Sequence, residues 1–409
     1  MYGLFFEAPF ISVYTGVFVG INMFICTLSN LLHNLCYTSG MEVFITHKSA
    51  LQYWRINHHM SREAFERRQR GRKPPVMPPK MSVLLSRKLF GLSLPLDITV
   101  GATNSRRPNR TFRPHVFPEV MPDRCLAKID SEILVASPEL CFFQMASELP
   151  LVKLIELGYE LCGSYSLPSK GTSDGPFVVG KDTASRAFVV GKDTAAGAFV
   201  VGKDTADGAF VVDKDTVDRD FVVDNDTSYN LEPLTSTKRL ETFVTQMTGK
   251  HGKKRAARAL RYIADGSASP METISAILLV LPNSLGGYGF PLPEMNRRID
   301  TKPAASGNLS KHFYKCDLYW KDSAVAAEYD SDLHHSGYDR ISDDSIRRSD
   351  LFLSGIEVIP ITNKQIYNIE EFDKVARIIA SKMGRRIQIR YSGFNAERRK
   401  LRGLLLKGI

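Results

Sequence analysis

Residues 314–335 read YKCDLYWKDSAVAAEYDSDLHH, two largely apolar runs of which the second ends in acids and histidines. Three carboxylates and two imidazoles follow the segment Ala324–Ala327: Glu328, Asp330, Asp332, His334 and His335. Carboxylates at the end of a buried strand repel one another and are costly to remove from water. The pattern therefore predicts that a metal ion or solvent compensates their charge.

The two runs predict a β-hairpin with strands over 314–320 and 323–330 and a tight turn at Lys321–Asp322. In that register Asp317 lies opposite Ala326, and Glu328 and Asp330 share its face because side chains two apart point the same way. Asp317 and Glu328 then stand diagonally, roughly 7–8 Å apart at the backbone, so both carboxylates can bind one Mg²⁺ or Mn²⁺ ion. The alternative is a solvated strand face, against which the apolar AVAA segment argues.

The chain before the hairpin predicts the first helices of an α/β domain that spans 231–383. A basic stretch, 237–264, reads as helical. A second helix begins with Ser269 as N-cap, Pro270 at the first helical position and Glu272 in the first turn.

The chain after the hairpin completes this domain. Residues 339–355 have the pattern of an amphipathic helix closed by Gly355, 356–362 that of a strand, and 369–383 that of a final helix. The predicted order is helix, strand, strand, helix, strand, helix. The basic tail, 384–409, is expected to fray.

These residues resemble the PD-(D/E)XK nuclease superfamily, and more specifically the very-short-patch-repair-like endonuclease domains of the DUF559 type. DLYWKDSAVAAEYDSDLHH and RRSDLFLSGIEVIPIT follow that family's pattern of D-x-x-W, an apolar strand, E-x-D-G-x-x-H, a helix with D-x-x-R, and L-x-x-x-G-x-x-V. The resemblance covers roughly 258–362. It implies a restriction-endonuclease-like α-β-β-α-β core with a mixed sheet, and a bacterial source.

The family's site residues carry over to individual positions. The first acid, the E-x-D pair, the histidine, the two helix positions and the auxiliary acid of the preceding helix correspond to Asp317, Glu328, Asp330, His334, Asp344, Arg347 and Glu272. The sequence departs from the pattern at Ser331, where the family usually has glycine, and Asp330 stands where the superfamily's motif names a lysine.

The resemblance implies metal-dependent hydrolysis of phosphodiester bonds in DNA, for phage defence or DNA repair. Asp317 and Glu328 would hold Mg²⁺ or Mn²⁺, with Asp330 tuning it, and His334 would position water or protonate the leaving oxygen. Arg347 would contact phosphate or pair with Asp344 on its own helix, and the pairing is the preferred interpretation. The rival hypothesis is a non-catalytic DNA-binding antitoxin or transcriptional regulator with a relic nuclease core.

Residues 41–165 predict a separate α+β domain. Helical patterns occur at His47–His58 and Arg62–Arg70, 94–100 has strand character, and Ser137–Pro138 begins a longer helical pattern. FITHKSALQYWR and RKLFGLSLPLDITV give this region a weaker resemblance to abortive-infection type IV antitoxins, whose N-terminal domain is a winged helix. That resemblance implies DNA and a cognate toxin as partners, and a generic α/β domain is the alternative.

Residues 166–230 contain five tandem units of eleven residues, which begin at Phe177, Phe188, Phe199, Phe210 and Phe221. Each unit pairs a short β run, FVV, with a turn-forming segment such as GKDT. A small β-solenoid is conceivable, but one FVV per turn buries little apolar surface. A flexible insertion is therefore the preferred interpretation.

The net charge of +10 and the pI of about 9.2 indicate an anionic partner. Three basic stretches, Arg62–Lys73, Arg106–Arg113 and Lys250–Arg258, are expected to attract DNA. The individual residues expected to contact it are Arg106, Arg107, Lys253, Lys254, Arg255, Arg347 and Arg348. Each stretch alone is more often a solvated face.

The six cysteines form no CxxC pair, which argues against a structural zinc site or a disulfide scaffold and favours a reducing, cytoplasmic interior. Residues 1–40 are a hydrophobic extension, within which 8–36 lack acids, lysine and arginine and are long enough to span a bilayer. The alternatives are a membrane anchor or a disposable extension from an upstream start codon. The second is favoured, so no membrane contact is expected.

Overall fold

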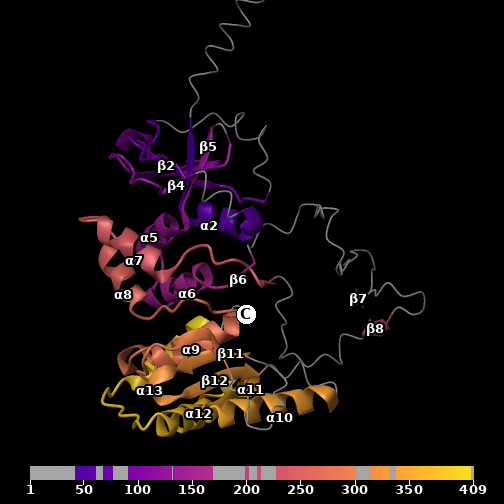
Figure 1. The fold of residues 1–409 in the computed structure, drawn as a ribbon. Helices are drawn as coiled ribbons and strands as arrows, with labels where there is room; N and C mark the ends of the chain where they lie inside the picture. Colours follow the sequence, from indigo (N-terminus) through magenta and orange to yellow (C-terminus); the bar gives the residue numbers. More distant parts are fainter. Residues whose placement is uncertain are drawn as a thin grey trace, which may run out of the picture.

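The computed structural model describes residues 42–60, 68–76, 91–130, 132–168, 199–201, 210–212, 227–300, 313–330 and 338–406. Within them the chain forms two larger β-sheets with helices between (Figure 1). The indigo-to-purple sheet comes from the N-terminal part of the chain, and the orange sheet comes from the C-terminal part. Both sheets mix parallel and antiparallel pairs, which confirms the expected α/β class.

The N-terminal sheet has five strands: β1 (Val43–Ile45), β2 (Leu96–Val100), β3 (Phe112–Val116), β4 (Leu126–Lys128) and β5 (Ile133–Ala136). Their order is β3-β2-β1-β5-β4, with β1–β5 and β2–β3 parallel and the other two pairs antiparallel. The domain is α+β as expected, but this sheet stands in place of the predicted winged helix. β1 pairs with a strand far along the chain, a contact that local patterns do not reveal.

Short helices connect the strands of this domain: α2 (His47–Ile56), η1 (His58–Met60) and η2 (Thr103–Ser105). α2 confirms the first predicted helix up to its last turn. Of the second, Arg62–Arg70, only the end is described, and it is extended, because Arg68 bridges Ala127 and the Gln69 N–H donates to the Leu126 carbonyl at 2.9 Å.

The longer helical pattern that begins at Ser137 forms two helices, α5 (Pro138–Glu148) and α6 (Leu151–Leu161). The Ser137 hydroxyl accepts the Leu140 N–H, as the predicted cap requires. The pattern divides at Leu149, which has an extended ψ of 144°. The cause is Pro150, because a residue before proline is driven out of the helical region.

The repeat insertion leaves the fold and returns to it at one place. β6 (Tyr165–Ser166) pairs antiparallel with β9 (Ser228–Tyr229), so the two ends of the insertion are adjacent. Two of the predicted FVV runs are strands, β7 (Phe199–Val201) and β8 (Phe210–Val212), which pair with each other. The remaining FVV runs lie outside the described residues.

The middle layer contains two basic helices, α7 (Thr237–Gln246) and α8 (Lys253–Leu260), where one continuous helical stretch was expected. The stretch is interrupted because Gly249 and Gly252 adopt positive φ angles of 72° and 89°. Both helices pack against α5, and α8 also packs against α6 (Figure 1).

α9 (Pro270–Val280) links this layer to the C-terminal sheet. Ser269 caps it as predicted, because its hydroxyl accepts the Glu272 N–H. α9 contacts α6 on one side and two strands of the C-terminal sheet on the other. One continuous hydrophobic core therefore runs from the N-terminal sheet to the C-terminal sheet.

The C-terminal sheet has four strands: β10 (Glu294–Asp300), β11 (Phe313–Trp320), β12 (Val325–Asp330) and β13 (Glu357–Thr362). β10–β11–β12 are antiparallel neighbours, and β13 runs parallel to β12. β10 is absent from the predicted order because its sequence, EMNRRID, is polar and partly exposed, without the apolar alternation that marks a strand.

The remaining helices follow the hairpin: α10 (Tyr338–Leu353), α11 (Asn363–Tyr367), α12 (Ile369–Lys382) and α13 (Phe394–Leu405). Gly355 follows α10 with a φ of 79°, as expected of a helix-closing glycine. The basic tail was expected to fray, and this prediction is wrong. α13 buries Phe394, Leu401 and Leu405 against α6 and α9, because its apolar residues fall on one face among the basic ones.

Four cysteines, Cys125, Cys141, Cys162 and Cys316, are free and buried. No helix among the described residues has the length and apolar character to cross a membrane. The segment 8–36 lies outside the described residues.

Candidate functional site

The turn between β11 and β12 is longer than predicted. A short 3-10 helix, η4 (Lys321–Ser323), and Ala324 with a φ of 50° replace the two-residue turn, because Lys-Asp lacks the glycine that such a turn favours. Leu318 therefore pairs with Ala327, a shift of two residues from the predicted register. Because two residues is one full period of a strand, the predicted faces are retained.

This shift improves the arrangement of the first two acids. Continued by one residue from the Leu318–Ala327 pair, the register sets Asp317 directly opposite Glu328 rather than diagonal to it. The Asp317 carboxylate accepts the Tyr329 N–H at 2.8 Å. A strand backbone thus holds the carboxylate in place where regular pairing ends.

Asp317, Glu328 and Asp330 open into one pocket of about 140 Å³. The same pocket is lined by Tyr329, Arg347, Arg348, Val358 and Pro360. Its walls therefore come from β11, β12, β13 and α10. Three carboxylates and two guanidinium groups in a pocket of this size make it suited to a charged ligand.

Burial shapes the electrostatics of the two facing acids. It raises the pKa of Glu328 to about 7, although the Arg347 guanidinium opposes the shift, and the Asp317 charge adds to it. Burial also raises the pKa of Asp317, opposed by its hydrogen bond from Tyr329 and by Arg347. The nearby positive charge and hydrogen bonds do not fully offset the cost of burying these ionised carboxylates, so a further positive charge would be favourable.

Arg347 is the positive charge that the fold itself supplies. Its Nη2 donates to Glu328 Oε1 at 2.6 Å and to the Lys315 carbonyl at 2.5 Å. α10 packs on the sheet, and this side chain reaches the strands. The side chain of Asp344 lies outside the described residues, so the predicted pairing with it stays a prediction. Arg348, the next residue, lines the pocket.

Glu272 lies behind the pocket rather than in its lining. Its carboxylate accepts hydrogen bonds from the Ala268 N–H at 2.9 Å, the Ser269 hydroxyl at 3.0 Å and the Asn296 amide at 2.5 Å. Burial, followed by the charge of Asp317, raises the pKa of Glu272 to about 7. The ionisation of Glu272 is therefore coupled to the charge of Asp317 in the pocket. The sequence did not predict its hydrogen-bond partner Asn296 on β10.

The residues of the pocket fit a hard divalent cation. Mg²⁺ takes oxygen ligands and usually binds one or two carboxylates together with water. Asp317 and Glu328 supply such ligands from facing strands, and Asp330 lines the same pocket. The predicted His334, with Asp332 and His335, lies outside the described residues.

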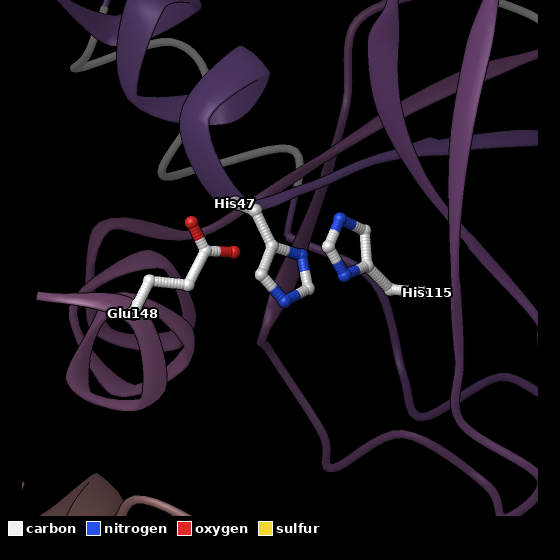
Figure 2. A group of neighbouring side chains, drawn as sticks. All are labelled: His47, His115 and Glu148. Atoms are coloured by element: carbon white, nitrogen blue, oxygen red, sulfur yellow. The ribbon is translucent and has the colours of Figure 1, made fainter. Parts of the chain in front are cut away.

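The strictest grouping of possible metal ligands lies elsewhere. Among the described residues, only His47, His115 and Glu148 bring three possible ligand atoms within 4.8 Å of one another (Figure 2). Sequence reasoning missed this group. The three residues are far apart in the chain and share no ligand spacing, so only the fold brings them together.

The other basic residues predicted to bind DNA lie on separate elements. Arg106 and Arg107 are exposed beyond η2 in the N-terminal domain. Lys253, Lys254 and Arg255 lie on α8, which packs against α5 and α6. Arg255 donates to the Ala146 and Leu149 carbonyls at 3.1 and 3.0 Å, so it helps to close the end of α5.

No protein-family model and no solved structure matches the chain. Two uncharacterised proteins of Mycobacterium tuberculosis, from strains CDC 1551/Oshkosh and ATCC 25618/H37Rv, are each 31% identical to it over 123 residues, or 30% of this chain. The match spans 40% of the length of each relative.

Proposed function

We propose that the C-terminal pocket is the site of a Mg²⁺- or Mn²⁺-dependent endonuclease that hydrolyses phosphodiester bonds in DNA. The observation that carries this proposal is the pair Asp317 and Glu328. They face each other across two strands of the C-terminal sheet and line one pocket, and the pKa of Glu328 is raised to about 7. Buried carboxylates with perturbed pKa values in a pocket are typical of functional sites.

The chain's own residues have distinct roles in this proposal. Asp317 and Glu328 would hold the ion, which would supply Lewis-acid chemistry by activating water and neutralising charge on the phosphate. Asp330 adjusts the charge of the pocket. Arg348, and Arg347 once Glu328 has a cation to pair with, would bind phosphate oxygens through their guanidinium groups.

The ion pair between Arg347 and Glu328 specifically favours a second candidate function. A guanidinium at 2.6 Å already compensates one of the two facing acids without any metal. This is the arrangement expected of a relic core in a DNA-binding antitoxin or transcriptional regulator. In that case a cognate toxin would be the partner, and the N-terminal domain would carry the binding.

A cleavage assay separates the two candidates. The full chain is incubated with plasmid, linear duplex and single-stranded DNA, with Mg²⁺, Mn²⁺ or EDTA. We expect metal-dependent cleavage that Asp317→Asn and Glu328→Gln each reduce by at least about 100-fold. Glu294→Gln, which alters an exposed carboxylate on the same sheet, should leave the rate unchanged.

The opposite result is equally specific. If no DNA is cleaved while all variants bind it equally well, the endonuclease proposal fails and the antitoxin reading is preferred. If cleavage persists in Asp317→Asn and Glu328→Gln, the hydrolytic site lies elsewhere in the chain.

A further inference from the structure

A second ligand-bearing cluster lies in the N-terminal domain, apart from the proposed nuclease pocket. His47 is the first residue of α2, His115 belongs to β3 and Glu148 is the last residue of α5. Figure 2 shows the two imidazoles side by side with the Glu148 carboxylate extending toward His47. The side chains of His115 and Glu148 are 25% and 28% exposed, so an ion can reach them from solvent.

The two imidazole rings are stacked, with centroids 3.5 Å apart and planes inclined by 14°. Burial lowers the pKa of His47 well below its usual value, and the neighbouring His115 and Lys48 lower it further. The fold therefore favours the neutral ring of His47, the form that binds metals.

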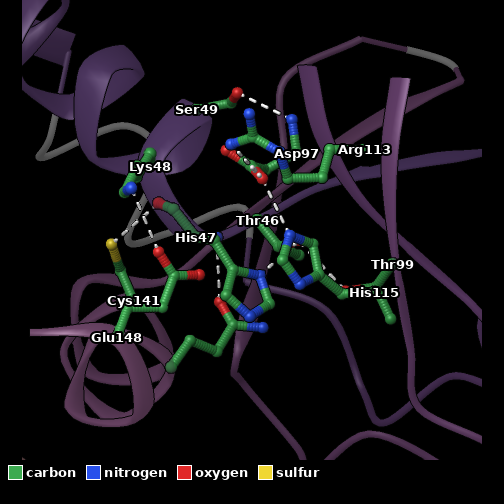
Figure 3. A network of polar contacts seen from close by, with 11 residues as sticks. Thr46, His47, Lys48, Ser49, Asp97, Thr99, Arg113, His115, Cys141 and Glu148 are labelled. Atoms are coloured by element: carbon green, nitrogen blue, oxygen red, sulfur yellow. Dashed lines mark hydrogen bonds and ion pairs between the residues drawn. The ribbon is translucent and has the colours of Figure 1, made fainter. Parts of the chain in front are cut away.

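A buried carboxylate orients His115 from behind. Asp97 Oδ1 lies 2.7 Å from His115 Nε2, and Asp97 is only 3% exposed (Figure 3). The Ser49 hydroxyl fixes Asp97 by accepting its backbone N–H at 2.8 Å. Histidines that bind metals usually give their second ring N–H to such a carboxylate. With Nε2 engaged in this way, His115 has Nδ1 for a metal.

His47 is oriented in a similar way. Its Nδ1 lies 3.1 Å from the Thr46 hydroxyl, which also accepts from the Thr99 hydroxyl at 3.1 Å (Figure 3). With Nδ1 engaged in this way, His47 has Nε2 for a metal. Each of the two rings thus has one nitrogen engaged by the protein and the other left for coordination.

The backbone at His47 is held in a strained conformation. Its φ of 50° is unusual for a residue other than glycine. Two side chains of α5 hold it there, because the His47 N–H donates to Gln144 at 3.1 Å and the Cys141 thiol donates to the His47 carbonyl at 3.4 Å. The helix that carries Glu148 therefore also fixes the position of His47. Strain of this kind often marks functional sites.

We propose that His47, His115 and Glu148 form a binding site for Zn²⁺. Two imidazoles and one carboxylate are a known ligand set for zinc, and three protein ligands leave a fourth position for water. Binding would draw the ligand atoms of the three side chains, which already lie within 4.8 Å of one another, onto the ion. It would also replace the ion pair of Glu148 with Lys48, which spans 3.3 Å between side chains that are 28% and 59% exposed, so little stability is lost.

Calorimetric titration of the full, metal-stripped chain with ZnCl₂ at neutral pH tests the site. We expect a single equivalent to bind, with at least about 100-fold weaker binding in His47→Asn and in His115→Asn. Asparagine is chosen at 47 because it tolerates a positive φ. His251→Asn, an exposed histidine outside the cluster, should bind as the wild type does. Glu328→Gln, which removes a ligand of the acidic pocket, distinguishes the two sites, because the tightly bound equivalent should remain in it.

Co²⁺ provides a spectroscopic check, because its visible absorption reports the number and type of ligands. The wild type should show an absorption band typical of four-coordinate Co²⁺. His115→Asn should lack this band, and the far-ultraviolet circular dichroism of this variant should equal that of the wild type. Absence of Zn²⁺ binding by the wild type overturns the proposal, as does equal binding by His115→Asn. Loss of binding in Glu328→Gln alone would assign the ion to the acidic pocket and also refute the site.

Discussion

In the acidic pocket and in the histidine cluster, the fold places charges of opposite sign beside the side chains that could bind a metal. In the pocket, Arg347 donates to Glu328 and supplies positive charge among the acids. In the cluster, the buried Asp97 lies behind His115 and supplies negative charge to an imidazole. A cation that enters the pocket must compete with the Arg347 guanidinium at Glu328, whereas a cation that enters the cluster must displace the more exposed Lys48 ammonium from Glu148. The two sites should therefore differ in metal preference and in response to pH.

The largest expected effect concerns Asp97. Asp97→Asn keeps the shape of the side chain but removes the charge behind His115, so Zn²⁺ should bind about 10- to 100-fold more weakly. Calorimetry on the full chain measures this loss, and Mn²⁺ binding at the acidic pocket should not change. An unaltered Zn²⁺ affinity would show that Asp97 does not support a metal ligand.

The next prediction concerns how stability depends on pH when EDTA removes metal ions, because the pKa of Glu328 is raised and that of His47 is lowered. Glu328 has a folded pKa of about 7, above its unfolded value of about 4.5, so its contribution to stability is greatest at low pH and is lost as the pH rises toward 7. His47 has a folded pKa below 6.5, so its contribution is present above pH 6.5 and is lost as the pH falls.

Urea unfolding at pH 5, 6 and 7 should separate these contributions. The free energy of unfolding of the wild type should fall by an amount on the order of 2 kcal/mol between about pH 4.5 and 7 as Glu328 ionises, since one pKa unit corresponds to about 1.4 kcal/mol. Glu328→Gln should abolish this fall. The wild type should also gain stability from the neutral His47 ring as the pH rises to 6.5, and His47→Asn should abolish this gain. If both variants change the pH dependence in the same direction, the contrast between the two regions is wrong.

A smaller effect is expected for Arg347→Met. Without the guanidinium beside Glu328, the pocket should bind Mn²⁺ about tenfold more tightly, because a unit charge about 4 Å away contributes about 1 kcal/mol or more. Electron paramagnetic resonance of free Mn²⁺ measures the affinity. Arg298→Met, on the exposed side of β10, is the matched control. Weaker binding in Arg347→Met would mean that Arg347 assists the ion rather than competing with it.

The smallest effect is expected from deletion of one eleven-residue repeat, residues 188–198. β6 and β9 hold the two ends of the insertion together, so shortening it should change the free energy of unfolding by only about 0.2 kcal/mol. Zn²⁺ and Mn²⁺ affinities should both remain those of the full chain. A change in either affinity would show that the insertion contributes to that site.

Much of the acidic pocket could be predicted from the sequence because its acids are local. Asp317 and Glu328 lie on adjacent strands of one hairpin, so the alternation of side chains places them on one face. The turn length could not be predicted, since the residue with a positive φ is Ala324 and not the glycine that usually marks such a position. The error was one full strand period, and for that reason the predicted face survived it.

The histidine cluster could not be predicted because its parts are not local. His47, His115 and Glu148 come from α2, β3 and α5, and they meet only when β1 pairs with β2 and α5 packs beside α2. The tail was misread for a related reason. α13 has the composition of a solvated segment, and the apolar surface it covers belongs to helices much earlier in the chain.

The short ladder between Ser166 and Ser228 has a consequence for how the gene can change. Tandem copies of eleven codons are prone to slippage during replication, and each gain or loss of a copy keeps the reading frame. Both ends of the insertion remain paired at β6 and β9 whatever the copy number. Alleles of different length should therefore encode proteins that retain the same two sheets and the same two ligand clusters.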